Sequence, residues 1–338
     1  MKLLNKVQVS TWVYVVIALL LAVVPFMTDN MSTLFLIIQI FIFGIFAMSY
    51  DLLLGFTGIV SFGHAMFFGI GAYGVSIFLG HNEPTFGYLI LGILVALLFA
   101  AIISFIAGAI TLRLKSHFYA MLTLALAGLF LVAAEKLRDL TGGSEGILFT
   151  VPDFFKDRTN MYLTALISLV VLFFILRRVT QSPLGRVLVA IRENEQRTAS
   201  LGYKIFPYKV IISVISGVVA AFAGVLYALS MRFVDTTIFA VDVTLDALLM
   251  TIIGGVGTLI GPIIGAGLIE YAHDFLKELT DVHWIFERWI ILFGIIYILV
   301  VIFFPKGIVG TIRGFFVNRK LKKETAKNQS KSDKEIAG

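Results

Sequence analysis

The chain has 338 residues, of which 59% are hydrophobic and only 14% are charged, and its formal net charge is +6. Soluble domains typically carry about 25% charged residues, so this composition excludes an ordinary soluble fold. The chain has no cysteine, which excludes disulfides and thiolate metal sites. Its basic residues gather in one central polar segment and near the C-terminus, which indicates membrane topology and argues against nucleic-acid binding.

Apolar runs long enough to cross a bilayer recur along the chain, since about 20 apolar residues span roughly 30 Å of hydrocarbon. The predicted spans are approximately 11–27, 33–54, 59–79, 86–112, 118–134, 161–176, 210–230 and 289–304, with a broken apolar region at 244–271. The sequence therefore predicts an all-α integral membrane protein, a polytopic bundle of about 8–10 transmembrane helices. Residues 1–312 are assigned to this transmembrane domain, and 313–338 to a basic, disordered cytoplasmic tail.

Glycine clusters interrupt two of the apolar regions, LLLGFTGIVSFGHAMFFGIGAYG at 52–74 and LLMTIIGGVGTLIGPIIGAGLIEY at 248–271. Their similar order of residues suggests two related halves, each with a glycine-broken hairpin. Bilayers tolerate non-helical backbone only where it is buried in protein or lines a water-filled cavity. The candidate residues of a translocation pathway are Gly55, Thr57, Gly58, Ser61, Gly63, Gly254, Gly255, Gly257, Thr258 and Gly261. The alternative is that these glycines only permit close packing of helices.

The central polar segment 180–208, TQSPLGRVLVAIRENEQRTASLGYKIFPY, has apolar residues at helical spacing and predicts a short amphipathic helix. Its apolar face holds Val187, Leu188, Ala190 and Ile191, and its charged side chains are Arg186, Arg192, Glu193 and Glu195. Pro183 suits a first helical turn, and Gly202 is expected to end the helix. We interpret the segment as a docking element for a soluble partner; the alternative is a solvated interfacial loop without a partner.

An excess of arginine and lysine in the central polar segment predicts that it faces the cytoplasm, together with both termini. Six spans precede the segment, which agrees with a cytoplasmic N-terminus. For the basic C-terminal tail to be cytoplasmic as well, region 244–271 must cross the membrane an even number of times.

Catalytic, nucleotide-binding and metal-binding motifs are absent from the sequence. It has no phosphate-loop lysine motif, no H-E-x-x-H or similar metal spacing, and no G-x-S-x-G nucleophile elbow. The sequence thus predicts no catalytic residue, metal site or cofactor in this chain. Ion-coupled carriers usually bury acidic residues in their spans, and these are scarce here. The energy for active transport is therefore expected to come from another polypeptide.

Several motifs occur in one order along the chain: DLLLGFTGIVSFGHAMFFGIGAYG, LRLKSHFYAMLTLAL, TGGSEGI, SPLGRVLVAIRENEQRTASLGYKIFPYKV, GGVGTLIGPIIGA and FPKGIVG. This ordered set resembles branched-chain amino acid ABC transporter permeases of the LivM type. The resemblance implies a multi-pass subunit of a bacterial cytoplasmic membrane, surrounded by lipid. Its implied partners are a second homologous permease (LivH-like), two cytoplasmic ATPases that bind ATP, and an extracytoplasmic solute-binding protein.

In the family that the chain resembles, the central polar segment is a coupling helix seated on the ATPase. The resemblance assigns that contact to Gly185, Arg186, Val187, Ala190, Ile191, Arg192, Glu193, Asn194 and Gly202. Two alternatives remain open at this stage. The same architecture serves urea, short amides and other small polar solutes, and a chain of this composition could also be an autonomous secondary carrier or channel.

Overall fold

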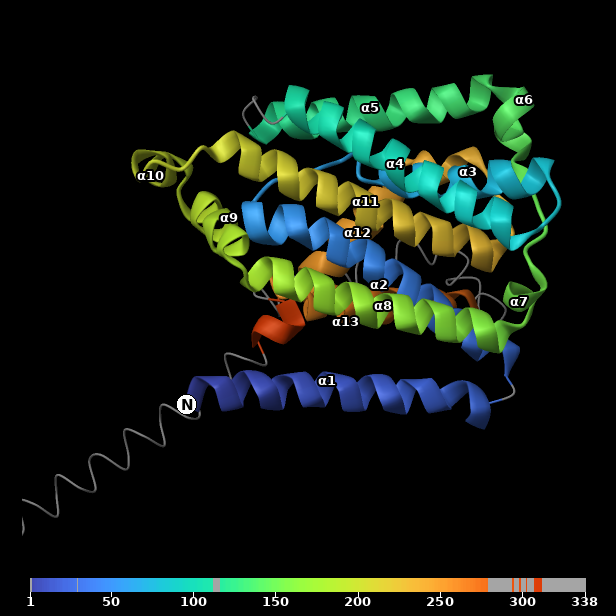
Figure 1. The fold of residues 1–338 in the computed structure, drawn as a ribbon, viewed down its shortest axis with the longest axis horizontal. Helices are drawn as coiled ribbons and strands as arrows, with labels where there is room; N and C mark the ends of the chain where they lie inside the picture. Colours follow the sequence, from blue (N-terminus) through green and yellow to red (C-terminus); the bar gives the residue numbers. More distant parts are fainter. Residues whose placement is uncertain are drawn as a thin grey trace, which may run out of the picture.

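The computed structural model describes residues 2–28, 30–111, 116–278, 294, 298, 302 and 307–311, and these residues form a bundle of helices lying along one axis (Figure 1). The long helices are α1 (Lys2–Met27), α2 (Met31–Thr57), α3 (Ala65–His81), α4 (Phe86–Thr111), α5 (Ser116–Lys136), α8 (Arg158–Gln181), α11 (Ile205–Met231), α12 (Val241–Gly254) and α13 (Ile260–Glu278). The short helical elements are α6 (Arg138–Thr141), η1 (Gly143–Glu145), α7 (Asp153–Lys156), α9 (Pro183–Glu193), α10 (Glu195–Ser200) and η2 (Thr236–Phe239).

Within the described residues, five helices are long and apolar enough to cross a membrane, namely α2, α4, α5, α8 and α11. Shorter apolar helical stretches occur at Tyr14–Met27 and Ala65–His81. The predicted all-α polytopic membrane fold is confirmed. The predicted span 289–304 lies outside the described residues except for 294, 298 and 302, and the predicted tail 313–338 lies wholly outside them.

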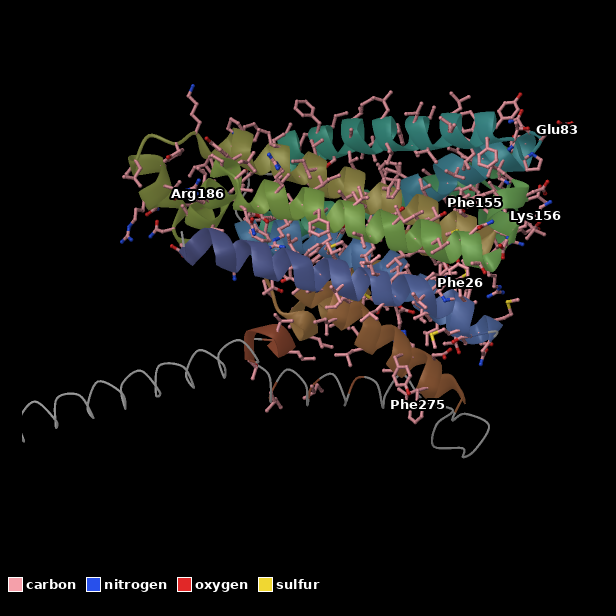
Figure 2. All side chains as sticks on the ribbon, turned by 60° about the horizontal axis from the view of Figure 1, so that its bottom comes forward. Phe26, Glu83, Phe155, Lys156, Arg186 and Phe275 are labelled. Carbon is pink, nitrogen blue, oxygen red and sulfur yellow. The ribbon has the colours of Figure 1, made fainter. Side chains whose placement is uncertain are left out.

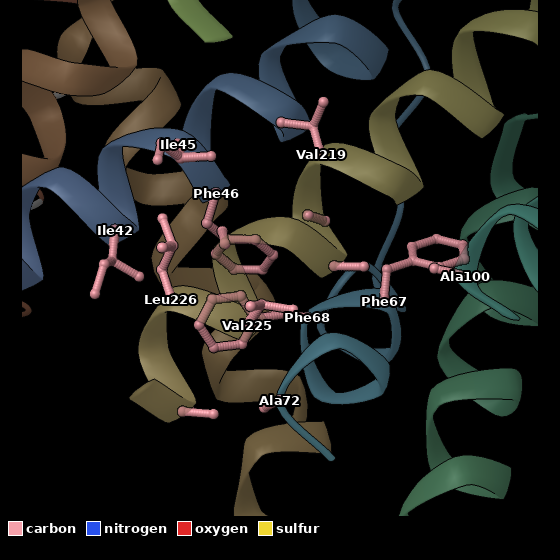
Figure 3. Packing of buried hydrophobic residues seen from close by; sticks show 14 of the residues in the cluster. Ile42, Ile45, Phe46, Phe67, Phe68, Ala72, Ala100, Val219, Val225 and Leu226 are labelled. Carbon is pink, nitrogen blue, oxygen red and sulfur yellow. The ribbon is translucent and has the colours of Figure 1, made fainter. Parts of the chain in front are cut away.

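The buried core is centred on α2, α3 and α11, whose aromatic and aliphatic side chains interlock (Figure 3). Phe46 of α2 and Phe68 of α3 have ring centroids 4.6 Å apart, and Leu226 of α11 is fully buried in the same cluster. In contrast, α4 exposes large apolar side chains such as Leu94 and Leu98, at 60% and 64%. Apolar exposure of this kind suits a helix that meets lipid, because lipid is as apolar as the side chains themselves.

The bundle has two distinct ends, which Figure 2 marks with Arg186 at one and with Lys156 and Glu83 at the other. The α9 end carries α9, α10, the start of α1 and the turn between α12 and α13 (Figure 1). Residues 307–311 belong to the same end, because a Cβ at Gly307 would lie 2.4–2.6 Å from the backbone of Gly255. The α7 end carries α6, α7 and a two-stranded antiparallel ribbon of β1 (Ile147–Leu148) and β2 (Phe233–Val234). The sequence did not predict this ribbon.

The first glycine break is longer than predicted. Helix α2 begins after Asn30, whose side chain accepts hydrogen bonds from two amides of the first turn, and continues to Thr57. It ends at Gly58, which has φ +72°, a left-handed conformation that favours glycine. Residues 58–64, here called the first break, are non-helical. The predicted span 59–79 is therefore partly wrong, because its helical portion α3 begins only at Ala65 and has 17 residues.

The second glycine region forms a helical hairpin. Helices α12 and α13 pack side by side, and residues 255–259, here called the second break, join them at the α9 end. The chain therefore reaches the α9 end through α12 and leaves it again through α13 (Figure 1). This path agrees with the even number of crossings that the parity argument requires.

Candidate functional site

The amphipathic helix predicted in segment 180–208 is present as α9, which lies across the ends of α2, α8 and α11 (Figure 1). Ser182 caps its start, with its hydroxyl 3.4 Å from the amide nitrogen of Gly185, and Pro183 occupies the first turn as predicted. The predicted stop at Gly202 is wrong for this helix. Asn194 ends α9 and caps α10 by accepting from the Arg197 amide at 2.8 Å, because its side chain competes with the helical backbone. Gly202 follows α10 with φ +90°.

The apolar face of α9 is turned toward this chain's own helices. Leu188 is 0% and Ile191 3% exposed, and Gly185 is also buried, with a Cβ at that position overlapping the carbonyl of Thr180. The interpretation of Ile191 as part of a surface for a soluble partner therefore needs correction, since its side chain packs into the bundle. Val187 and Ala190 are half-buried. The outward face carries Arg186, Val189, Glu193 and Asn194; Arg192 is also exposed, but its guanidinium reaches back to α2.

Arg192 connects α9 to the end of α2, just before the first break. Its Nη1 donates a hydrogen bond to the backbone carbonyl of Gly55, in the last turn of α2. The same nitrogen would lie 3.1 Å from a Cβ at Gly257, so the guanidinium sits beside the second break as well. Hydrogen bonds from a charged donor are stronger than neutral ones, at about 1.5–3 kcal/mol. Arg192 is thus the point at which the surface helix meets both broken segments.

Asp51 connects α2 to the second break. It is fully buried, and its Oδ1 accepts a hydrogen bond from the Gly257 amide at 2.6 Å, while its Oδ2 accepts one from the Leu259 amide at 3.0 Å. Leu259 has φ +58°, a conformation that is costly for a residue with a branched side chain. The carboxylate of Asp51 therefore fixes a turn that the backbone would not favour alone. Asp51, Gly55, Arg192, Gly257 and Leu259 are here called the Asp51–Arg192 cluster.

The last turn of α2, just before the first break, touches the second break through backbone atoms at this cluster. A Cβ at Gly55 would lie 2.5 Å from the nitrogen and 2.7 Å from the Cα of Gly257, so only glycine fits there. Thr258 closes the second break, because its hydroxyl donates to the Gly255 carbonyl at 2.7 Å and accepts from the Gly261 amide at 2.9 Å. The structure thus brings together predicted pathway residues from segments about two hundred positions apart.

The other predicted pathway residues are engaged in packing in this conformation. Ser61 and Thr57 are buried, and the Thr57 hydroxyl donates to the Leu53 carbonyl of its own helix at 2.6 Å. Gly63 lies against the backbone of Thr123 in α5, and Gly254 lies against that of Gly261. These contacts favour the close-packing reading of the glycines in this state, while their place in a translocation pathway stays a prediction.

His64 is buried inside the bundle, where the starts of α3 and α12 meet. Its Nε2 is 2.8 Å from the Ser49 hydroxyl, and the next amide, that of Ala65, donates to Thr244 in the first turn of α12 at 2.8 Å. Helix α3 then runs toward the ribbon at the α7 end, and α12 runs toward the α9 end (Figure 1). His64 is therefore an interior histidine with a hydroxyl partner. Within the part of the chain that the structure describes, no three His, Asp or Glu side chains lie close enough together to hold a metal ion.

Sequence reasoning missed the partner of Asp51. An acidic residue inside an apolar span is costly and needs polar surroundings, but nothing in the sequence pointed to amides 206 and 208 residues away. It also missed Val189, the most central apolar residue on the outward face of α9, because the periodic pattern had assigned the apolar face to its neighbours.

The fold and the cluster together define a class of protein: a polytopic membrane protein whose surface helix is hydrogen-bonded to a membrane helix beside two glycine-broken segments. The chain belongs to the family described as "Branched-chain amino acid transport system / permease component", which matches residues 32–304. That description names a transport component.

Curated relatives of this family cover most of the chain. The "High-affinity branched-chain amino acid transport system permease protein LivM" of Escherichia coli K12 is 28% identical, over 94% of this chain and 78% of that protein. The protein of the same description from Salmonella typhimurium LT2 is 27% identical, over 80% of this chain and 68% of that protein. The "Probable branched-chain amino acid transport permease protein LivM" of Methanocaldococcus jannaschii is 27% identical, over 78% of this chain and 89% of that protein. No solved structure matches the chain.

Proposed function

We propose that this chain is one of two permease subunits of an ABC importer for branched-chain amino acids. In this proposal two cytoplasmic ATPases bind ATP and drive transport, a second homologous permease (LivH-like) completes the membrane domain, and an extracytoplasmic solute-binding protein delivers the substrate. The family, together with the descriptions of its relatives, supports the transport role and the substrate class. The observation that carries the mechanism is the bond between Arg192 of α9 and Gly55 at the first break.

The orientation in this proposal places the α9 end in the cytoplasm. The basic residues of segment 180–208 and of the tail 313–338 support it, since arginine and lysine accumulate on the cytoplasmic side of membrane proteins. Helix α9 then faces the ATPases with Arg186, Val189 and Glu193 outward. The α7 end, with its ribbon and short helices, faces the extracytoplasmic binding protein.

The proposed mechanism is alternating access driven from outside this chain. When ATP brings the ATPases together, they displace α9, and Arg192 transmits that displacement to the first break. Asp51 passes it to the second break through Gly257 and Leu259. The second break moves with the end of α2, which leads directly into the first break, because the backbones touch at Gly55 and Gly257. A motor can bias the bundle only through contacts that differ between its two states, and the Asp51–Arg192 cluster is where we expect that difference.

Reconstitution in proteoliposomes tests the proposed function. Vesicles that contain this chain with its second permease, ATPases and binding protein should accumulate radiolabelled leucine only when ATP is present on the ATPase side. Vesicles that contain this chain alone should take up none. ATP-independent leucine equilibration through the single chain would contradict the proposal and indicate an autonomous carrier or channel. ATP-driven uptake of urea or a short amide, with leucine ignored, would keep the architecture and refute the substrate class.

A further inference from the structure

A cavity of about 390 Å³ opens at the α7 end of the bundle, whereas the Asp51–Arg192 cluster lies at the α9 end. Its walls come from α2, α7, α8 and the end of α11. The described residues that line it are Phe35, Ile38, Phe155, Lys156, Arg158, Met161, Leu229, Ser230, Met231 and Arg232. Three of them are cationic and none is acidic, and the volume falls in the usual range of small-molecule sites.

The two arginines of this cavity are held in place by the protein backbone. Arg158 donates to the Met31 carbonyl at 3.2 Å, and its guanidinium lies 5.3 Å from the centre of the Phe35 ring. Arg232 donates to the carbonyls of Phe155 and Lys156 at 3.2 and 3.0 Å. Each guanidinium has five N–H groups, so these bonds position the side chain and leave donors for a ligand.

Arg232 occupies an unusual backbone conformation for its type. It ends α11 with φ +58°, where glycine is the common residue, and its side chain ties the end of α11 to α7. Strained residues of this kind tend to be retained where the side chain has a task. Lys156 contributes less free charge than the arginines, because it forms an ion pair with Asp153 at 2.7 Å.

The rest of the cavity offers apolar surface and a hydrogen-bond acceptor. Ile38, Met161 and Leu229 form an aliphatic wall. Ser230 provides a hydroxyl, and behind it the Gln39 side chain donates to that hydroxyl at 3.4 Å. The Gln39 carbonyl oxygen is buried with no hydrogen-bond partner among the described residues. Gln39 itself does not line the cavity, so the Ser230 hydroxyl, whose donor partner is the Gln39 amide, is the polar group that a ligand can reach.

We propose that this cavity binds the carboxylate of a small amino acid, with Arg158 and Arg232 on the carboxylate, Ser230 near the ammonium group, and the aliphatic wall against the side chain. Such a site would receive the substrate at the outer mouth of this subunit, before the breaks open. The inference rests on the proposed function, which supplies the class of cargo and the extracytoplasmic position of the α7 end. Charge complementarity favours an anionic group because the described lining residues carry no acid.

Thiol labelling tests the inference directly, because the chain has no cysteine of its own. Ser230→Cys places a single thiol in the cavity, in the assembled transporter without its binding protein or ATP. An anionic methanethiosulfonate should modify this thiol faster than a cationic one. The reference is the same pair of reagents on Leu148→Cys, an 80% exposed position at the same end. The measured quantity is the ratio of the anionic to the cationic modification rate at position 230, divided by the same ratio at position 148. This quantity should fall by about fivefold when Arg158→Gln removes one nearby charge. Arg138→Gln, an exposed cation on α6 away from the cavity, should leave it unchanged.

Ligand protection distinguishes the sources of the anionic group. L-leucine should slow modification of Ser230→Cys by about tenfold at ten times its dissociation constant. L-leucinamide, which keeps the ammonium and side chain but lacks the carboxylate, should protect far less. Protection that requires phosphatidylglycerol and is indifferent to leucine would assign the cavity to a lipid headgroup and overturn the proposal. Equal rates for both reagents with no protection by leucine would also overturn it.

A parallel experiment, with the unsubstituted complex, its binding protein and ATP, separates this inference from the proposed function. ATP-dependent leucine uptake by the unsubstituted complex is measured in parallel. Normal uptake without leucine protection would refute the cavity assignment alone, whereas loss of the ATP dependence would refute the proposed function.

Discussion

Replacing Arg192 with glutamine should lower the leucine imported per ATP hydrolysed by about tenfold, while the subunit remains folded in the membrane. The substitution removes the charged donor to the Gly55 carbonyl, a bond worth about 1.5–3 kcal/mol. A tenfold effect corresponds to about 1.4 kcal/mol of coupling free energy, so loss of this bond is sufficient to produce it. The measurement compares leucine uptake with phosphate release in proteoliposomes that contain the assembled transporter.

Two further variants show whether the effect belongs to this bond. Arg197→Gln removes an exposed arginine on the neighbouring α10 and should leave coupling unchanged. Arg192→Lys keeps the charge and one donor, so it should restore part of the coupling. Full coupling in the Arg192→Gln transporter would mean that α9 moves the bundle through its apolar face alone, and Arg192 would lose its assigned role.

Replacing Asp51 with alanine should destabilise the subunit and abolish uptake. The buried amides of Gly257 and Leu259 would lose their acceptor, at about 1–3 kcal/mol for each N–H left unbonded. The strained turn at Leu259 would also lose the group that holds it. Thermal unfolding of the purified subunit, followed by its tryptophan fluorescence, should therefore begin at a clearly lower temperature than in the unsubstituted protein.

Asp242→Asn provides the matched control for Asp51. Asp242 is an exposed acid in the first turn of α12, part of the same hairpin, and its replacement should change stability by no more than about 0.5 kcal/mol. An Asp51→Ala subunit with unchanged unfolding temperature and normal uptake would contradict the view that this carboxylate fixes the second break.

The sequence predicted those parts of the fold that depend on local pattern. The long apolar runs predicted the ends of α2, α4, α5, α8 and α11 to within a few residues, because the thickness of the hydrocarbon layer sets the length of a spanning helix. The period of segment 180–208 gave α9, and the Ser182-Pro183 pair gave its start. The glycine cluster at 254–258 gave the position of the turn between α12 and α13.

Features that depend on tertiary contacts could not be predicted from the sequence. Ile59 and Val60 are apolar and read equally well as helix or as extended chain, so the length of the first break could not be predicted. The direction of the apolar face of α9 was misassigned because the pattern shows that a face is buried, not what buries it. The link from Asp51 to Gly257 joins segments 206 residues apart, and no local rule specifies such a pairing.

Crosslinking from the outward face of α9 tests most directly whether this helix contacts the ATPase subunits. Val189→Cys, in the otherwise cysteine-free chain, carries a thiol-attached photoreactive group in the assembled transporter. Leu188→Cys, buried one position away, serves as the comparison. We expect position 189 to give a covalent adduct with the ATPase subunit and to resist impermeant thiol reagents added outside intact cells. Labelling of position 189 from outside, or the absence of any ATPase adduct, would contradict the coupling role of α9.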